Sequence, residues 1–208
     1  MILLEGILLG LIPAFMAGPL TIALMYTAIE KSTPAGLSVG LGIWVSDIIY
    51  ILAVYFGFNY LMKLSGISSF NWSLGGIGSA ILIAIGIGIL LKKQNFEEVR
   101  SNRVKTRDLL QAFWKGFAIN TFNPVAVIFW TSVMGAIIIE RNWGPHEATL
   151  FFSGTMISVI GSDFLKVILA KWLTKWLTPK RWQAVSKISG YLFIIFGIMI
   201  LVRVAMGV

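Results

Sequence analysis

The sequence predicts an all-α membrane protein with six transmembrane helices. Of its 208 residues, 57% are hydrophobic and only 12% are charged. The mean hydropathy is +0.85. Several apolar runs exceed about 18 residues, long enough to cross a hydrocarbon core of about 30 Å as a helix. A single soluble core of this size does not need so much apolar surface, so soluble folds are excluded.

The apolar runs place the six helices at roughly 3–28, 36–60, 73–91, 112–138, 147–171 and 184–206. A polar, basic stretch at about 92–111 separates the third helix from the fourth. We expect one transmembrane domain over 1–208, with three helices in about 1–91 and three in about 112–208. No basic segment precedes the first apolar run and no cleavage site follows it, so we interpret it as a retained helix rather than a signal peptide.

The lysines and arginines predict the orientation. Six spans put the loops after helices 1, 3 and 5 on one side, and fourteen of the 17 basic residues fall there. By the positive-inside bias this side is cytoplasmic, so both termini lie outside the cytoplasm. Loop topology therefore explains the net charge of +8 without nucleic acid as a partner. In the basic segment before helix 6, Trp172, Trp176 and Trp182 suit the lipid headgroup level.

Two short motifs each occur once in either half of the chain. One is a proline inside helices 1 and 4, and the other is a Ser-Asp pair in helices 2 and 5. They are Gly18-Pro19, Asn123-Pro124, Ser46-Asp47 and Ser162-Asp163. Because each half has three spans, a second copy enters the membrane in the opposite orientation, as in many secondary transporters. We predict two inverted three-helix repeats in which helices 1 and 4 are broken.

The two prolines remove backbone hydrogen bonds inside the membrane. Pro19 would free the carbonyl of Phe15, and Pro124 would free that of Asn120. In lipid such groups must find a partner or line a wet cavity. One interpretation is that the broken helices bind a zwitterion, with a helix N-terminal end for its carboxylate and freed carbonyls for its ammonium. The alternative is a pair of simple kinks that neighbouring helices satisfy.

Two acidic side chains lie within the predicted spans. Asp47 stands about eleven residues into helix 2, roughly 16 Å deep. A carboxylate near the bilayer centre costs about 2.5–3.5 kcal/mol, so such residues usually face a cavity or a partner. Burial disfavours the charged form, which makes Asp47 a candidate for substrate binding and proton coupling; the alternative is a structural hydrogen bond. Asp163 is a second proton-coupling candidate, although Lys166 is close enough to pair with it.

Several other chemistries are not expected. The chain has no cysteine, which excludes disulfides and thiolate metal sites. A single histidine, His146, cannot form a metal site alone. The spans contain no nucleophile–base pair, so we expect no catalytic residue, no cofactor and no metal, and a transporter rather than an enzyme.

The sequence resembles the LysE/RhtB group of bacterial amino-acid exporters over essentially its whole length. Three segments carry the likeness: Ala17-Gly18-Pro19-Leu20-Thr21, Gly36-Leu37-Ser38-Val39-Gly40 and Lys115-Gly-Phe-Ala-Ile-Asn120-Thr-Phe-Asn123-Pro124. The first motif of the family is typically Pro-Gly-Pro, and a basic residue typically follows its Asn-Pro. Here Ala17 and Val125 stand at those two positions, which leaves the identity of the substrate open.

The resemblance implies export of amino acids or close derivatives from the cytoplasm across the bacterial inner membrane. It implies H⁺ or Na⁺ as the driving ion and a homodimer. Matched to the motifs, it assigns substrate binding to Gly18, Pro19, Asn120, Asn123 and Pro124. Two alternatives remain open at this point: an inorganic cation exporter of a related family, and a membrane scaffold that transports nothing.

Overall fold

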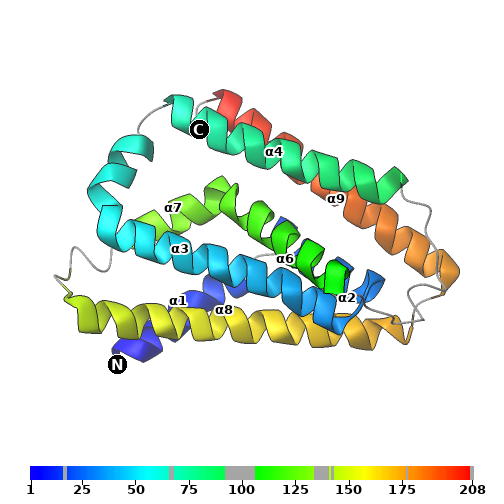
Figure 1. Cartoon of the computed structure of the whole chain (residues 1–208), viewed down its shortest axis with the longest axis horizontal. Coiled ribbons are helices and arrows are strands. Elements are labelled where there is room, and N and C mark those ends of the chain that lie inside the picture. The colour runs from blue at the N-terminus through cyan, green and yellow to red at the C-terminus, as the bar shows by residue number, and fades with distance from the viewer. Residues whose placement is uncertain are drawn as a thin grey trace.

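The computed structural model describes residues 1–15, 18–65, 68–91, 106–133, 141, 143–176 and 178–206, without the side chains of 14–15, 58–75, 124 and 203–205. Over these residues it is entirely helical. The helices are α1 (Ile2–Phe15), α2 (Pro19–Glu30), α3 (Thr33–Ser65), α4 (Ser68–Leu91), α6 (Thr106–Thr121), α7 (Pro124–Val133), α8 (Pro145–Thr174) and α9 (Pro179–Met206). Figure 1 shows them as a layered bundle in which both termini lie at the same end.

Both proline motifs coincide with a break between helices. The expected first helix is α1 followed by α2, and α2 begins at Pro19. The expected fourth helix is α6 followed by α7, which begins at Pro124. Proline suits a first helical position, because the N–H that it lacks would have no partner inside the helix. The other four expected helices correspond to α3, α4, α8 and α9.

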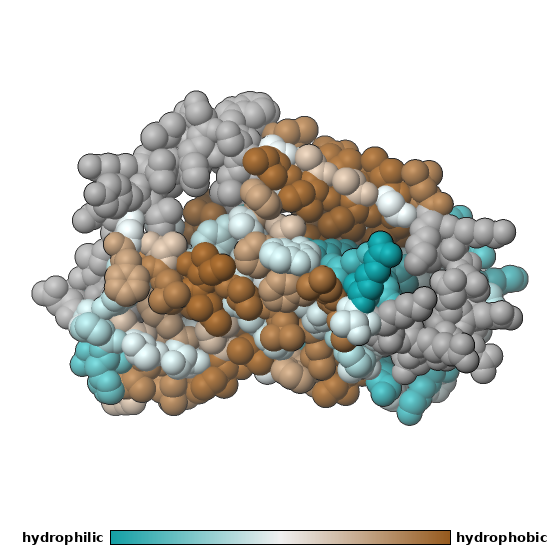
Figure 2. All heavy atoms as spheres, viewed as in Figure 1, coloured by the Kyte–Doolittle hydropathy of each residue, from teal (hydrophilic) through white to brown (hydrophobic). Residues whose placement is uncertain are grey.

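Three of the helices are long and apolar enough to cross a membrane: Thr33–Gly57 within α3, Pro145–Thr174, and Pro179–Val202 within α9. Ile2–Pro13 and Gly76–Leu91 are shorter apolar helices. The outer surface of the bundle is correspondingly apolar over most of the face shown in Figure 2. The protein is therefore a helical membrane protein. Gly57 has non-helical angles (φ −122°, ψ 19°), so α3 is kinked at the end of its apolar part.

Two sequence predictions need correction. The polar stretch expected at 92–111 is helical from Thr106, because hydropathy locates the membrane and not the end of a helix that projects beyond it. Trp182, expected at the headgroups, is 1% exposed and stacks on Tyr26 with ring centroids 5.4 Å apart. The bundle offers this indole an aromatic partner, which lipid does not. Residues 134–138 of the expected fourth helix lie outside the described part.

Helix pairs define the layers. Helices α4 and α9 run antiparallel along one side of the bundle (Figure 1), where Gly86 and Gly190 let the backbones approach and Ser79 donates to the carbonyl of Gly197 at 2.7 Å. Helix α1 runs parallel to α8, and α6 runs parallel to α3. Small residues at such contacts are typical of membrane helices, which gain from close backbone packing rather than from a hydrophobic effect.

The α1–α8 and α3–α6 contacts bring helix backbones close together. A Cβ added to Gly10 would lie 2.6 Å from the carbonyl oxygen of Thr155, and one added to Gly116 would lie 2.1 Å from that of Val39. Serine hydroxyls reinforce both contacts across the helix pairs. The serine bonds are Ser158 Oγ to the carbonyl of Ile7 (2.7 Å) and Ser38 Oγ to the carbonyl of Leu109 (2.6 Å). The first half of each broken helix is thus fixed to one long helix.

Candidate functional site

Asp47 is the best-defined buried acid. It is 6% exposed on α3, and its Oδ1 accepts hydrogen bonds from Asn120 Nδ2 (2.8 Å) and Trp130 Nε1 (3.0 Å). The Asn120 amide also donates to the carbonyl of Ile43 at 3.2 Å. The structure therefore brings together two residues predicted to be functional, Asp47 and Asn120. They come from α3 and from the end of α6.

Both donors to this carboxylate are electrically neutral. A buried charge is tolerated when it is hydrogen-bonded, but amide and indole donors leave the net charge of Asp47 in place. One donor comes from α6 and the other from α7, on either side of the second helix break. The hydrogen bonding of Asp47 thus depends on how α6 and α7 are placed relative to α3.

The second break is held by its own polar groups. Asn123 Oδ1 accepts from the backbone N–H of Val125 at 3.1 Å, which caps the start of α7. The backbone N–H of Asn123 donates to the carbonyl of Asn120 at 3.0 Å. The expectation that this carbonyl is free is therefore wrong, because the turn between α6 and α7 supplies a donor. Pro124 is the first residue of α7.

Helix α3 also closes the end of α6. The hydroxyl of Tyr50 donates to the carbonyl of Thr121, and Ser46 Oγ lies 2.9 Å from Thr121 Oγ1. The last carbonyls of a helix have no partner inside it, so these contacts satisfy groups that lipid could not. Ser46, Asp47 and Tyr50 therefore form one polar stripe on α3 that faces the second break.

The first break is more open. Gly18 is extended (φ −126°, ψ −174°) and its carbonyl accepts from the N–H of Ile22 at 3.1 Å, ahead of Pro19. A Cβ added to Gly18 would meet nothing within 4 Å. Among the described residues, close packing therefore does not require a glycine at position 18. Helix α1 ends at Phe15, the residue whose carbonyl Pro19 was expected to free. Neither Gly18 nor Pro19 forms a hydrogen bond with Asp47 in the described part of the chain.

Asp163 has a different set of partners from Asp47. It is 6% exposed on α8, accepts from Trp44 Nε1 at 3.0 Å through Oδ2, and forms an ion pair with Lys166 Nζ at 2.9 Å through Oδ1. The ion pair anticipated from the three-residue spacing is present. Asp163 is thus neutralised by a cation on its own helix, unlike Asp47.

Sequence reasoning missed the two tryptophans that bond to the aspartates. Trp44 and Trp130 lie in the middle of apolar segments, whereas membrane tryptophans favour the interface. A buried indole N–H usually finds an acceptor. Mid-span tryptophan was therefore the available signal that an acceptor lies inside the bundle.

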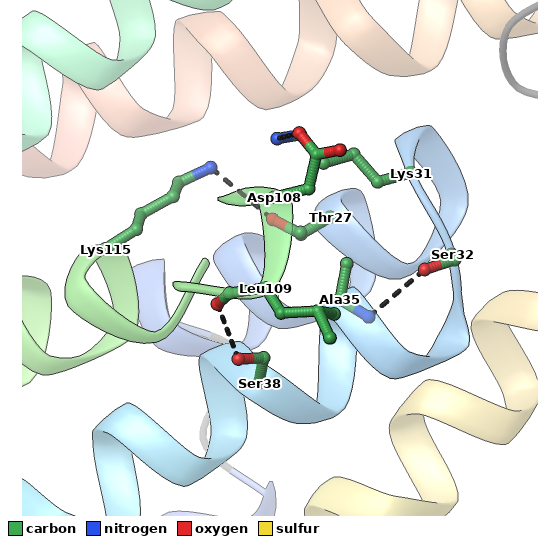
Figure 3. A network of polar contacts seen from close by, with 8 residues as sticks. All are labelled: Thr27, Lys31, Ser32, Ala35, Ser38, Asp108, Leu109 and Lys115. Atoms are coloured by element: carbon green, nitrogen blue, oxygen red, sulfur yellow. Dashed lines mark hydrogen bonds and ion pairs between the residues drawn. The ribbon is translucent and has the colours of Figure 1, made fainter. Parts of the chain in front are cut away.

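A further polar cluster, the α2–α6 cluster, joins the end of α2 to the start of α6 (Figure 3). Lys31 pairs with Asp108 at 2.9 Å, and Lys115 Nζ lies 3.5 Å from Thr27 Oγ1. Lys115 also lies over the ring of Tyr26, 5.7 Å from its centroid. The ammonium of Lys115 therefore lies inside the bundle. Among the described residues, no three His, Asp or Glu side chains gather as a metal site would require.

Comparison with known proteins gives two matches. The family model for the LysE type translocator matches residues 11–203. A protein of Bacillus subtilis (strain 168), named "Putative amino acid efflux protein YcgF", is 28% identical over 198 residues, which cover 94% of this chain and 93% of the relative. No solved structure matches the chain.

Proposed function

The chain belongs to the LysE type translocator family, and from this premise we propose that it exports amino acids or close derivatives, driven by protons moving inward. The name of the relative from Bacillus subtilis supports amino acids as the substrate class. The observation that carries proton coupling is the environment of Asp47. A buried carboxylate held only by the neutral donors Asn120 and Trp130 gains from taking up a cation, and a proton needs no additional ligands.

The position of Asp47 supports a link between proton binding and conformation. Its donors flank the break between α6 and α7, while the carboxylate itself is on α3. A movement of the broken helix relative to α3 would change those hydrogen bonds and hence the stability of the charged form. Conversely, protonation would weaken the bonds and release the broken helix. Such reciprocity is what coupling two binding events requires.

The helix contacts support two inverted repeats. When Gly10 is aligned with Gly116, its contact with Thr155 corresponds to the contact of Gly116 with Val39. The same alignment of α3 with α8 places the two buried aspartates at equivalent positions. Because α1 runs from left to right in Figure 1 and α6 runs from right to left, the second copy would be turned over relative to the first. Transporters of this plan bind substrate where the repeats meet, which here is between the two breaks.

The α2–α6 cluster supports alternating access. It ties the first repeat to the second at one end of the bundle, through Lys31–Asp108 and Lys115–Thr27 (Figure 3). Both members of the ion pair are about one-third exposed, and such pairs contribute only about 0–1 kcal/mol. Contacts of this strength can hold one end of the bundle closed. They can also break without a large energy barrier, as the opening of a gate requires.

The distribution of basic residues supports a cell-membrane protein with both termini outside. The end opposite the termini carries the end of α2, the start of α6, the end of α8 and the start of α9 (Figure 1). Its described basic residues include Lys31, Lys171, Lys175, Lys180 and Arg181. By the positive-inside bias this end faces the cytoplasm, so the α2–α6 cluster would be the cytoplasmic gate.

The test is efflux from proteoliposomes preloaded with pooled labelled amino acids, with and without an imposed pH gradient. In Asp47→Asn the side-chain oxygen still accepts from Asn120 and Trp130, so the fold is retained while the group that binds a proton is lost. We expect gradient-driven efflux of a few amino acids from the wild type and loss of gradient dependence in the variant. Glu147→Gln, at the start of α8, is the control and keeps it. Unchanged gradient dependence in Asp47→Asn would reject Asp47 as the coupling residue, and no efflux from the wild type would reject amino-acid export.

A further inference from the structure

The two buried aspartates share one type of hydrogen-bond donor and differ in their other partner. Each accepts an indole N–H at 3.0 Å: Asp47 from Trp130 on α7, and Asp163 from Trp44 on α3. Each is 6% exposed. An indole donor is therefore common to both aspartates, and they differ in the second group that contacts the carboxylate.

The remaining ligand is neutral at one aspartate and cationic at the other. Asp47 receives the amide of Asn120 at 2.8 Å, whereas Asp163 receives the ammonium of Lys166 at 2.9 Å. The side chains of Lys166 and Asp163 are only 17% and 9% exposed. At this burial water screens the pair little, and the two charges together are far less costly than either alone.

The two ligands also differ in how they respond to movement of the helices. Lys166 lies on the same helix as Asp163, three residues on, so a rigid movement of α8 carries the pair with it. The partners of Asp47 come from α6 and α7, so a movement of either helix relative to α3 would alter them. The cation at Asp163 is permanent, and the hydrogen bonding of Asp47 depends on conformation.

We propose that Lys166 is a built-in counter-ion that keeps Asp163 ionised throughout transport, so that Asp47 alone of the two aspartates binds the coupling proton. The inference rests on the proposed proton-driven export and limits it to one proton-binding carboxylate in this pair. Lys166 is a positioning residue that acts through Asp163. The second oxygen of the Asp163 carboxylate accepts from Trp44 on α3.

Other charged groups near the pair belong to neighbouring helices. Asp163 interacts electrostatically with Asp47, and Asp47 with Tyr50, so these groups are part of one local field. The remaining described titratable side chains on the helices packed against α8 are Glu5 on α1, Tyr26 and Glu30 on α2, and Tyr55 on α3.

The test is the infrared band of protonated carboxyl groups, recorded against pH on the purified full chain in lipid. We expect a wild-type band that disappears in Asp47→Asn and persists in Asp163→Asn. Lys166→Met removes the counter-ion, so a second band should appear, and Lys166→Met combined with Asp163→Asn should abolish it. Lys166→Arg, which keeps the cation, and Lys171→Met, an exposed lysine on the same helix, should add no band.

The outcomes separate this inference from the proposed function. A wild-type band lost in Asp163→Asn, or no new band in Lys166→Met, would overturn it even if amino-acid export is intact. If Lys166→Met does not fold, Asp163→Asn and Lys166→Arg still decide, because the inference requires both to leave the wild-type band in place. The bands are read without transport, so a protein that exported nothing would still report which aspartate binds a proton.

Discussion

Replacing Gly154 by alanine tests the α1–α8 contact directly. The added Cβ would lie 2.2 Å from the carbonyl oxygen of Leu3 and 3.0 Å from the backbone nitrogen of Ile7. Ordinary contact begins at 3.4 Å, so α1 must move by about 1.2 Å. Both obstacles are backbone atoms of a helix, which cannot turn aside as a flexible side chain can.

The magnitude follows from a control on the same helix. A Cβ on Gly161 of α8 would meet nothing within 4 Å. Alanine gains about 1 kcal/mol over glycine in a helix interior, and both substitutions share this gain. Overpacking typically costs about 1–3 kcal/mol. The free energy of unfolding of Gly154→Ala should therefore lie about 1–3 kcal/mol below that of Gly161→Ala, towards the upper value because the obstacle is backbone.

The assay is unfolding of the purified protein in mixed micelles with a rising fraction of SDS, followed by circular dichroism. Gly161→Ala should unfold at or above the wild-type midpoint and Gly154→Ala below it. The proposed repeat adds an internal check, because Gly10→Ala and Gly116→Ala would occupy equivalent contacts and should both lower the midpoint. Equal midpoints for Gly154→Ala and Gly161→Ala would refute the packing argument.

Three further predictions follow from polar contacts. Trp130→Phe removes one of two donors to the buried carboxylate on α3 and should lower the free energy of unfolding by about 1 kcal/mol in the same assay. Ser38→Ala and Ser158→Ala each remove one hydrogen bond between a long helix and a half-helix, so each should cost about 0.5–1.5 kcal/mol, and no change in either would contradict this. Lys31→Asp should alter the efflux rate by repulsion with Asp108, and the added exchange Asp108→Lys should restore it; failure of the exchange to restore the rate would argue against a gate.

Much of the fold could be predicted because the membrane simplifies it. Apolar runs located all six helical regions, and proline located both breaks, since a missing N–H is costly where water cannot replace it. The family resemblance drawn from the motifs is confirmed by the match over residues 11–203. Hydropathy failed where helices extend into polar surroundings, as at Thr106, because it reports the solvent and not the backbone.

The site was predictable only in part. Burial and spacing identified Asp47 and the pairing of Asp163 with Lys166, because both depend on position along one helix. The partners Trp44 and Trp130 depend on which helices are neighbours in space, and a single sequence does not record that. The substrate contact expected of Asn123 stays a prediction, and its oxygen also caps α7; the residue type suits both roles equally well.

The proline of the second break shapes the site indirectly. By starting α7 it ends α6 at Thr121, and the unpaired carbonyl there accepts the hydroxyl of Tyr50 on α3. That contact holds the polar stripe of α3 against the break, with Asp47 one turn from Tyr50 and within reach of Asn120. In a continuous helix the Thr121 carbonyl would accept a backbone N–H of the same helix. It would then not be available to Tyr50 on α3. The break therefore places a carboxylate where its hydrogen bonds depend on the position of the broken helix, and this dependence is what proton coupling needs.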